Sequence, residues 1–166
     1  PERTTLRAIS EYRGAWRRME YRGISRISGV KCQIYDDYAH HPTEIKATLK
    51  AFKEKFPSRP LVCVYQPHQA KRLKVLFKNF EKAFNDAHIT IILPVYKVSG
   101  RDQTDKKFDS RALVKAIQIK QPRKLVFYLE NPKNLRKALE VLLKSIVAKP
   151  KTLSPIRLWA TFLSIL

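Results

Sequence analysis

The chain has 166 residues, of which 44% are hydrophobic, and it carries a net charge of +20. A chain of this length buries roughly 70% of its unfolded surface as a single domain, which excludes a disordered polymer. Its four glycines form no phosphate-binding loop and no dinucleotide-binding motif, and its two cysteines exclude a disulfide framework. The positive charge is spread along the chain, so general solubility, anionic substrates and nucleic acid all remain open as its explanation.

Two strands and a helix are predicted in the first third of the chain. Residues 21–36 contain two strand-like runs joined at Ser28-Gly29, where glycine can take the positive φ of a tight turn. Apolar residues spaced three and four apart then predict a helix over Pro42–Lys55, and a proline suits the first turn of a helix.

Strands and helices alternate along the rest of the chain. Short apolar runs predict buried strands at Leu61–Tyr65, Ile89–Leu93 and Leu125–Leu129. Helical spacing predicts helices over Gln69–Asp86, after an N-cap at Asp109-Ser110, and over Pro132–Val147. This alternation predicts an α/β domain with a mainly parallel sheet, in which the turns that follow the strands share one rim.

The turn Asp36-Asp37-Tyr38-Ala39-His40-His41 holds the first candidate site. Two carboxylates, a phenol and two imidazoles lie within six residues between a predicted strand and a predicted helix. Asp37 or His41 could cap the helix, but capping explains one aspartate at most. We expect a functional site here and no metal centre, because adjacent side chains diverge and the i, i+4 histidine pair of zinc proteases is absent.

A second polar cluster, Gln66–Arg72, follows the next predicted strand in the same relative place. His68 and Arg72 are four residues apart, so in a helix they would share a face of the first turn, where an anion can bind. A third feature lies upstream, at residues 13–20, and contains paired arginines and a tryptophan. Its alternative interpretation is a charged surface with one packed aromatic ring.

Together, the segments RGAWRRME at 13–20, DDYAHHPTEI at 36–45 and YQPH with a following arginine at 65–72 resemble the C-terminal domain of the Mur ligases. The resemblance covers about residues 1–147, and the Gln-Pro-His turn is most similar to members of the family that add L-alanine. It implies a three-layer Rossmann-like α/β domain. The mainly parallel sheet would have about six strands, one of them antiparallel, with helices on both faces.

The resemblance further implies a cytoplasmic, ATP-dependent ligase of peptidoglycan synthesis that joins UDP-N-acetylmuramate to L-alanine through an acyl phosphate. N-terminal and central domains, absent from this chain, would hold most of the ATP and Mg²⁺, and this part alone would be inactive. Arg18 and Asp37 would contact ATP. Substrate-binding residues would be Tyr38, His40, His41, His68 and Arg72. No catalytic residue and no metal ligand is expected in this part of the enzyme.

Two departures from the family are visible. Gln69 stands where the family commonly has a second arginine, which weakens anion contact. The family usually ends with a strand and a Met-Gly-Ala-Gly-Asp turn, which residues 151–166 do not resemble. We therefore expect residues 1–150 to form the closing domain and residues 151–166 to be an atypical tail, truncated or altered in reading frame. Because the chain begins at Pro1, we also expect it to be a piece of a longer protein.

A basic nucleic-acid-binding module is the alternative function. Seventeen aromatic residues and 34 Lys and Arg could supply stacking and phosphate contacts. No RNA-binding motif is present, however, and the aromatic residues of the predicted helices recur at core spacing.

Overall fold

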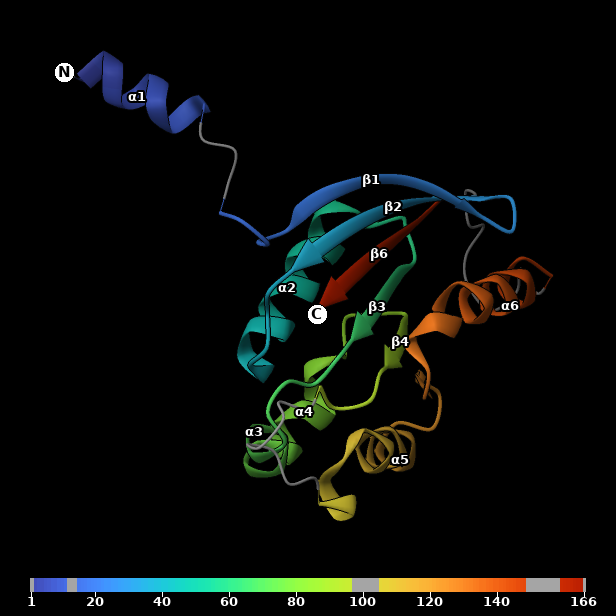
Figure 1. Ribbon diagram of the computed structural model, residues 1–166. Helices are drawn as coiled ribbons and strands as arrows, with labels where there is room; N and C mark the ends of the chain where they lie inside the picture. The colour runs from blue at the N-terminus through green and yellow to red at the C-terminus, as the bar shows by residue number, and fades with distance from the viewer. Residues whose placement is uncertain (1, 12–14, 97–104, 149–158, 166) are drawn as a thin grey trace.

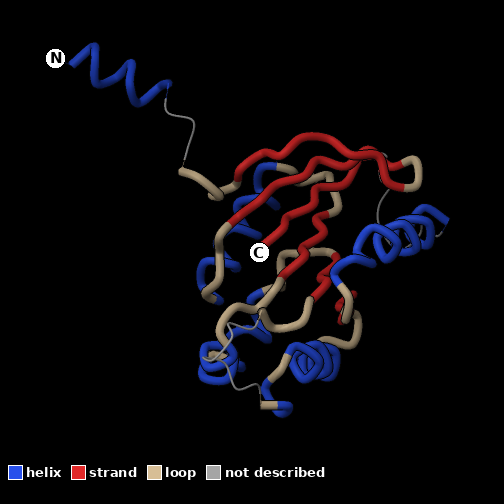
Figure 2. The backbone as a smooth tube through the Cα atoms, viewed as in Figure 1, coloured by secondary structure: helices blue, strands red, loops and turns tan. Residues whose placement is uncertain are grey.

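The computed structural model describes residues 2–11, 15–96, 105–148 and 159–165. Its strands form one sheet in the order β1-β2-β6-β3-β4-β5, in which β1 is antiparallel to β2 and the other neighbours are parallel (Figures 1 and 2). The strands are β1 Glu20–Ile27, β2 Val30–Asp37, β3 Leu61–Tyr65, β4 Ile89–Ile92, β5 Leu125–Tyr128 and β6 Trp159–Ile165.

The helices are α1 Glu2–Glu11, α2 Pro42–Lys55, α3 Ala70–Val75, α4 Phe77–Ala83, α5 Ser110–Lys120 and α6 Leu135–Ala148, with 3₁₀ turns at Lys106–Phe108 and Pro132–Asn134. The predicted bounds of α2 and β3 are confirmed, as is the Asp109 N-cap of α5, whose carboxylate accepts from the Ala112 amide. The helix predicted over Gln69–Asp86 is wrong as one element. It is interrupted at Leu76, whose φ of −103° and ψ of 18° lie outside the helical region, so the chain changes direction between α3 and α4.

Two hydrophobic cores lie on the two faces of the sheet. Along β3, Leu61, Cys63 and Tyr65 pack with α2, α3, α4 and α5, while Val62 and Val64 pack with Leu139 and Leu143 of α6. The alternation follows from the strand period of two, which sends successive side chains to opposite faces. The predicted α/β class, with parallel strands, an antiparallel pair and helices on both faces, is confirmed.

Strand β6 comes from the segment that was predicted to be an atypical tail. Its backbone lies between β2 and β3 and pairs in parallel with both. Asp37 at the end of β2 and Tyr65 at the end of β3 both pair with Ile165, so the two strands end level with each other. Neighbouring strands are about 4.8 Å apart, so the carboxyl ends of β2 and β3 lie about 10 Å apart, with β6 between them.

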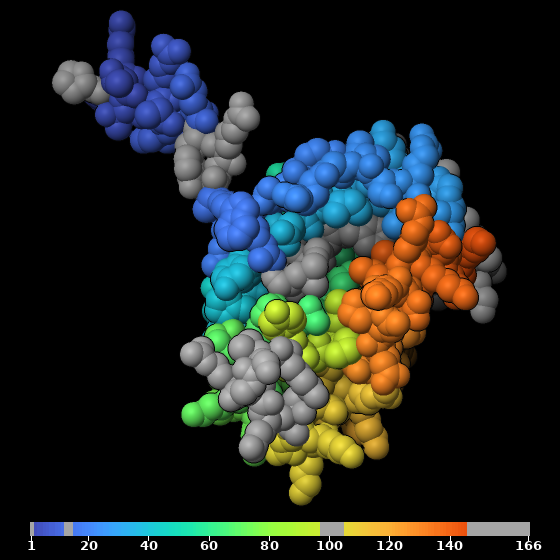
Figure 3. Space-filling view, in the orientation of Figure 1, coloured from blue at the N-terminus to red at the C-terminus, as the bar shows by residue number. Residues whose placement is uncertain are grey.

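Helix α1 stands away from the sheet (Figures 1 and 3) and buries none of its side chains. No helix was predicted over these residues from the sequence. Both cysteines are buried thiols, and burial raises the pKa of the Cys63 thiol to about 12, which makes it an unreactive core residue. Among the helices that the structure describes, none combines the length and the hydrophobicity that a membrane crossing requires.

Candidate functional site

The first corner, residues 36–41, is fixed by two carboxylates at the end of β2. The guanidinium of Arg17 donates to both oxygens of Asp36, over 3.0 Å from Nε and 3.4 Å from Nη2. Asp37 is 1% exposed, and its two oxygens accept from the backbone amides of Met19 and Ala39, each over 2.8 Å. These bonds attach residues 15–20 to the end of β2, because buried carboxylates need partners.

This attachment holds the chain in an unusual backbone conformation. Arg17 and Met19 have φ values of 52° and 48°, in the left-handed region that non-glycine residues rarely adopt. The Tyr38 amide donates to the Arg17 carbonyl over 2.7 Å, and the Arg17 guanidinium lies 5.1 Å from the centre of the half-exposed Tyr38 ring. Strain of this kind persists only where the surroundings over-determine it, as they do here.

Glu44 organises the two histidines of the first corner. One carboxylate oxygen accepts from the backbone amides of His40 and His41, over 3.0 and 3.1 Å. In return, Nδ1 of His41 accepts from the Thr43 amide over 3.3 Å, which completes a capping box at the start of α2.

The environment of Glu44 keeps its carboxylate charged. Burial acts to raise the pKa of Glu44, but the two amide hydrogen bonds and the charges of His40 and Arg18 outweigh it and lower the pKa from 4.5 to about 2. Arg18 lies 3.4 Å from Glu44 and 3.7 Å from Asp37, and 44% of its side chain is exposed. The first corner therefore holds a fixed anion beside a solvent-accessible guanidinium.

The second corner, residues 66–72, is held by fewer contacts. The His68 ring stacks on Tyr96 with centroids 5.0 Å apart, and the Gln66 amide donates to the Pro94 carbonyl over 3.2 Å. Gln69 has a φ of 64° and precedes α3, so His68 lies outside the helix. The predicted sharing of a helical first turn by His68 and Arg72 is therefore wrong.

Arg72 carries an uncompensated, half-buried charge in the second corner. Its side chain is half-buried, and no carboxylate of the described residues lies within ion-pair distance of it. Close enough to feel its charge lies Tyr65, a residue that is 1% exposed and whose hydroxyl has no hydrogen-bond partner among the described residues. Burial raises the pKa of Tyr65, while the positive charge of Arg72 acts to lower it, so the phenol stays protonated.

The two corners lie at the ends of β2 and β3, on either side of β6, and their charges act on each other. Burial lowers the pKa of His68, and the positive charges of Arg17, His40 and Arg72 lower it further. Charges act this way only over short range, so the imidazoles of both corners and two arginines gather at the carboxyl ends of β2 and β3. At neutral pH His68 is consequently uncharged, and it can accept as well as donate a hydrogen bond.

The predicted site residues divide into accessible and internal groups. Arg18, Tyr38, His40, His41, His68 and Arg72 have side chains that solvent can reach at least in part, whereas Asp37 is buried and both of its oxygens accept from backbone amides. One ring nitrogen of His40 and one of His41 also bond to the backbone. Contact between Asp37 and the ribose of ATP stays a prediction, because both carboxylate oxygens of Asp37 accept hydrogen bonds from backbone amides in this structure. Within the described ranges, no three His, Cys, Asp or Glu side chains gather where a metal ion could bind.

The structural roles of three residues were not predicted from the sequence: Arg17, Glu44 and Tyr96. The spacing from His41 to Glu44 is that of a capping box, which is usually recognised with Ser or Thr at its first position. Nothing in the sequence pairs Arg17 with Asp36 or Tyr96 with His68, because those partners are 19 and 28 residues apart and meet only in the fold.

Comparison with known families decides the relationship of the chain. Residues 17–151 match the family described as "Mur ligase, glutamate ligase domain". The chain belongs to the Mur ligases. The match includes both corners and every strand except β6, so the C-terminal-domain resemblance predicted from three short motifs is confirmed over most of the chain.

The curated relatives are themselves named as ligases of one kind. UDP-N-acetylmuramate--L-alanine ligase of Desulfotalea psychrophila is 41% identical over 92 residues, which is 55% of this chain and 19% of the relative. The enzyme of the same name from Sulfurihydrogenibium sp. is 37% identical over 142 residues, which is 86% of this chain and 28% of the relative. This Mur ligase chain therefore spans less than a third of these relatives.

Solved structures show the same fold. UDP-N-acetylmuramate-alanine ligase from Thermotoga maritima superposes with a TM-score of 0.61 and 23% identity, covering 96% of this chain and 28% of that one. The murein peptide ligase from Psychrobacter arcticus gives a TM-score of 0.53 and 20% identity, covering 97% and 29%. At these identities the comparison establishes the α/β architecture of the Mur ligase domain.

Proposed function

We propose that this chain is the closing domain of an ATP-dependent ligase that adds L-alanine to UDP-N-acetylmuramate in the cytoplasm. The observation that carries the proposal is structural: two motifs of the family lie at the ends of β2 and β3, and these strands end at the same level of the sheet. The names of the curated relatives support the choice of enzyme. The proposed domain consists of residues 1–150 together with residues 159–165, because β6 pairs with both β2 and β3. The sheet would have six strands in the intact protein, with β6 supplied by residues 151–166.

The proposed chemistry uses positioned positive charge. Joining a carboxylate to an amine at the expense of ATP concentrates negative charge on phosphate and carboxylate oxygens, and cationic donors fixed beforehand stabilise that charge. Arg18 fits a phosphate oxygen, since its guanidinium is accessible and held by Asp37 and Glu44. Arg72 fits the carboxylate end of a substrate, because no carboxylate of the described chain neutralises it.

His40 and His68 would line the space between these arginines. His40 Nδ1 lies 3.0 Å from the Tyr38 carbonyl and His68 stacks on Tyr96, so each ring is held in position while part of it stays accessible. A neutral His68 can accept a proton or a hydrogen bond from an amino group.

The Mg²⁺ that such ligases use would be held mainly outside this chain, since the carboxylates of Asp36 and Asp37 are already occupied.

The isolated chain would be inactive, and the missing domains supply the test. A chimera that joins this chain to the N-terminal and central domains of a curated relative should release ADP only when L-alanine and UDP-N-acetylmuramate are both present. His40→Ala and Arg72→Ala should each lower that rate about ten- to a hundred-fold, the loss expected for a charge-assisted contact. Arg123→Ala, at an exposed position before β5, is the control.

Unchanged turnover in both variants would contradict the substrate-binding roles proposed for His40 and Arg72. The nucleic-acid alternative is disfavoured by the family match. It would regain support only if the chain bound RNA tightly with a steep dependence on salt.

A further inference from the structure

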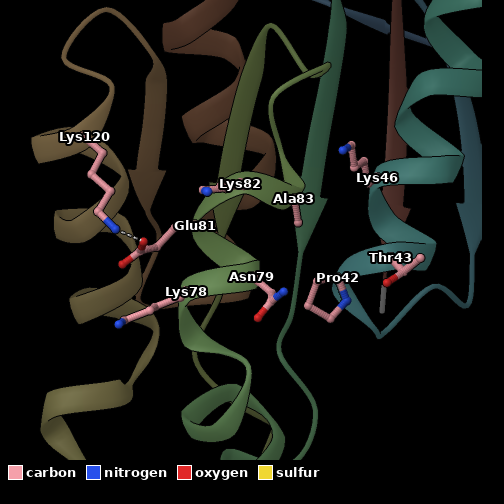
Figure 4. A pocket seen from close by; sticks show the side chains of 9 residues that line it. All are labelled: Pro42, Thr43, Lys46, Lys78, Asn79, Glu81, Lys82, Ala83 and Lys120. Atoms are coloured by element: carbon pink, nitrogen blue, oxygen red, sulfur yellow. Dashed lines mark hydrogen bonds and ion pairs between the residues drawn. The ribbon is translucent and has the colours of Figure 1, made fainter.

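A second concave surface lies away from the two corners. A groove of about 450 Å³ crosses the helices α2, α4 and α5 on one side of the sheet (Figure 4). It begins at Pro42 and Thr43, directly after His41, and it ends at Lys120 near the end of α5. Its volume falls within the range of small-molecule binding sites.

The groove is strongly basic. Four lysines line it, Lys46 from α2, Lys78 and Lys82 from α4 and Lys120 from α5, against the single carboxylate of Glu81. Lys120 of α5 pairs with Glu81 of the neighbouring α4, a contact that Figure 4 shows at one side of the groove. Because Glu81 is buried and offsets only one ammonium group, four positive charges and one negative charge leave the groove with a net charge of +3.

The other three lysines have no acidic partner in the part of the chain that the structure describes. Lys78 and Lys82 are four residues apart on α4, where like charges face each other and repel. Such an arrangement is unfavourable in the free protein, and an anion between the ammonium groups would relieve it. Lys46 lines the groove from α2, on the side opposite Lys78 and Lys120 (Figure 4).

The neutral lining supports recognition of phosphate oxygens. Asn79 contributes an amide and Thr43 a hydroxyl, and both can donate to phosphate. The backbone amide of Thr43 already donates to His41, so these contacts would come from side chains and not from the helix end. The described lining contains no aromatic ring on which a base could stack, which disfavours single-stranded nucleic acid.

From these observations we propose that this groove, which we call the lysine groove, binds a small anion carrying two or more phosphate groups. Lysine is a compact point charge suited to phosphate, and several lysines around one concavity match a ligand with several charged oxygens. The proposal stands on the groove alone and is independent of the ligase function.

The test uses inorganic tripolyphosphate as the probe and the 166-residue chain as the protein. We expect saturable one-to-one binding by calorimetry, with NMR shift changes at Thr43, Asn79 and Lys82. The double variant K78Q/K82Q should weaken binding at least about ten-fold, since it removes two of the three unpaired charges. The matched control K137Q/K144Q removes the same charge from exposed positions on α6, across the sheet, and should change the affinity less than about two-fold.

Three results would overturn the proposal. Equal weakening by the two double variants would show that only the overall charge attracts the anion. Binding that fails to saturate would show the same. If a uridine oligonucleotide bound more tightly than tripolyphosphate and K78Q/K82Q abolished that binding, the lysine groove would serve nucleic acid. Equal thermal midpoints of all variants establish that the chain remains folded in each measurement.

Discussion

The two corners of the candidate site are built differently. In the first, every acidic group has partners: Asp36 holds Arg17, Asp37 holds two backbone amides, and Glu44 holds both histidine amides. In the second, His68 depends on one stacked ring, and Arg72 has no acidic partner within the described residues. The difference indicates that the first corner is mainly a scaffold, whereas the second retains free charge for a ligand.

The strand between the corners gives the largest expected effect. Ending the chain at residue 158 removes β6, which pairs with both β2 and β3, and separates the two corners. We expect this truncated chain to lose cooperative unfolding in urea, because a central strand supplies backbone partners to both neighbours. A chain without α1, which buries no side chain, is the control and should unfold as the parent does. Cooperative unfolding of the truncated chain would show that the corners do not need β6.

Asp37→Asn tests the scaffold role of the first corner. One amide would lose its acceptor, and the buried network would lose its charge, so we expect the free energy of unfolding to fall by about 3 kcal/mol. Urea denaturation at pH 7 measures it. The control, exposed Glu54→Gln, should change the stability by less than about 0.5 kcal/mol. An equally small change for Asp37→Asn would contradict the scaffold interpretation.

Arg72→Ala tests the opposite expectation for the second corner. Because Arg72 contributes no ion pair to the described fold, its removal should change stability by less than about 0.5 kcal/mol. In the chimeric ligase the same variant should reduce kcat/KM about ten- to a hundred-fold. Comparing urea denaturation with ADP release separates the two effects. A variant that lost stability and kept its activity would reverse the roles of the two corners.

Glu44→Gln tests the acid dependence of the first corner. The pKa of Glu44 is about 2 in the folded protein against 4.5 ordinarily, so its charge stabilises the fold above pH 4.5 and that stabilisation is lost as the pH falls from 4.5 toward 2. At pH 7 the variant should lose about 1 kcal/mol, the value of a helix cap. Thermal midpoints measured between pH 7 and pH 2 should fall less steeply in the variant, whereas Glu130→Gln, at a highly exposed position, should match the parent.

Gln69→Gly gives the smallest effect and has the opposite sign. Gln69 has a positive φ that glycine adopts without strain. We expect the free energy of unfolding to rise by about 0.5 kcal/mol, because the strain released in the folded protein exceeds the entropic cost of a flexible glycine in the unfolded chain. Gln69→Ala keeps the strain and should gain nothing. A gain in both would locate the effect in the side chain of Gln69 and not in the backbone.

Much of this fold could be predicted from the sequence. The hairpin turn is confirmed at Gly29, which has a φ of 80°, and the helix α2 and strand β3 have their predicted bounds. These elements follow from local spacing, from proline at a helix start and from glycine in a turn, all of which act within a few residues. Both corners could also be located from the sequence, because many polar groups directly after a buried strand are costly unless they bind partners or a ligand.

The exceptions depend on partners distant in the chain. Local pattern gave no sign that Arg17 would bind Asp36, that Tyr96 would stack on His68, or that the break at Leu76 would divide one predicted helix in two. Residues 159–165 lie outside the family match and yet form a strand at the centre of the sheet, since a central position depends on backbone pairing and not on matching motifs.

The sequence by itself determined the α/β class, most of the elements and the two motifs that carry the family relationship, since these are properties of short segments. Only the tertiary structure decided which charges are available. Burial and hydrogen bonding occupy Asp37 and His41, while the fold leaves Arg72 and three lysines of the groove without acidic partners among the described residues. Whether a charge is neutralised depends on what folding brings within a few ångströms, and residue spacing along the chain does not contain that information.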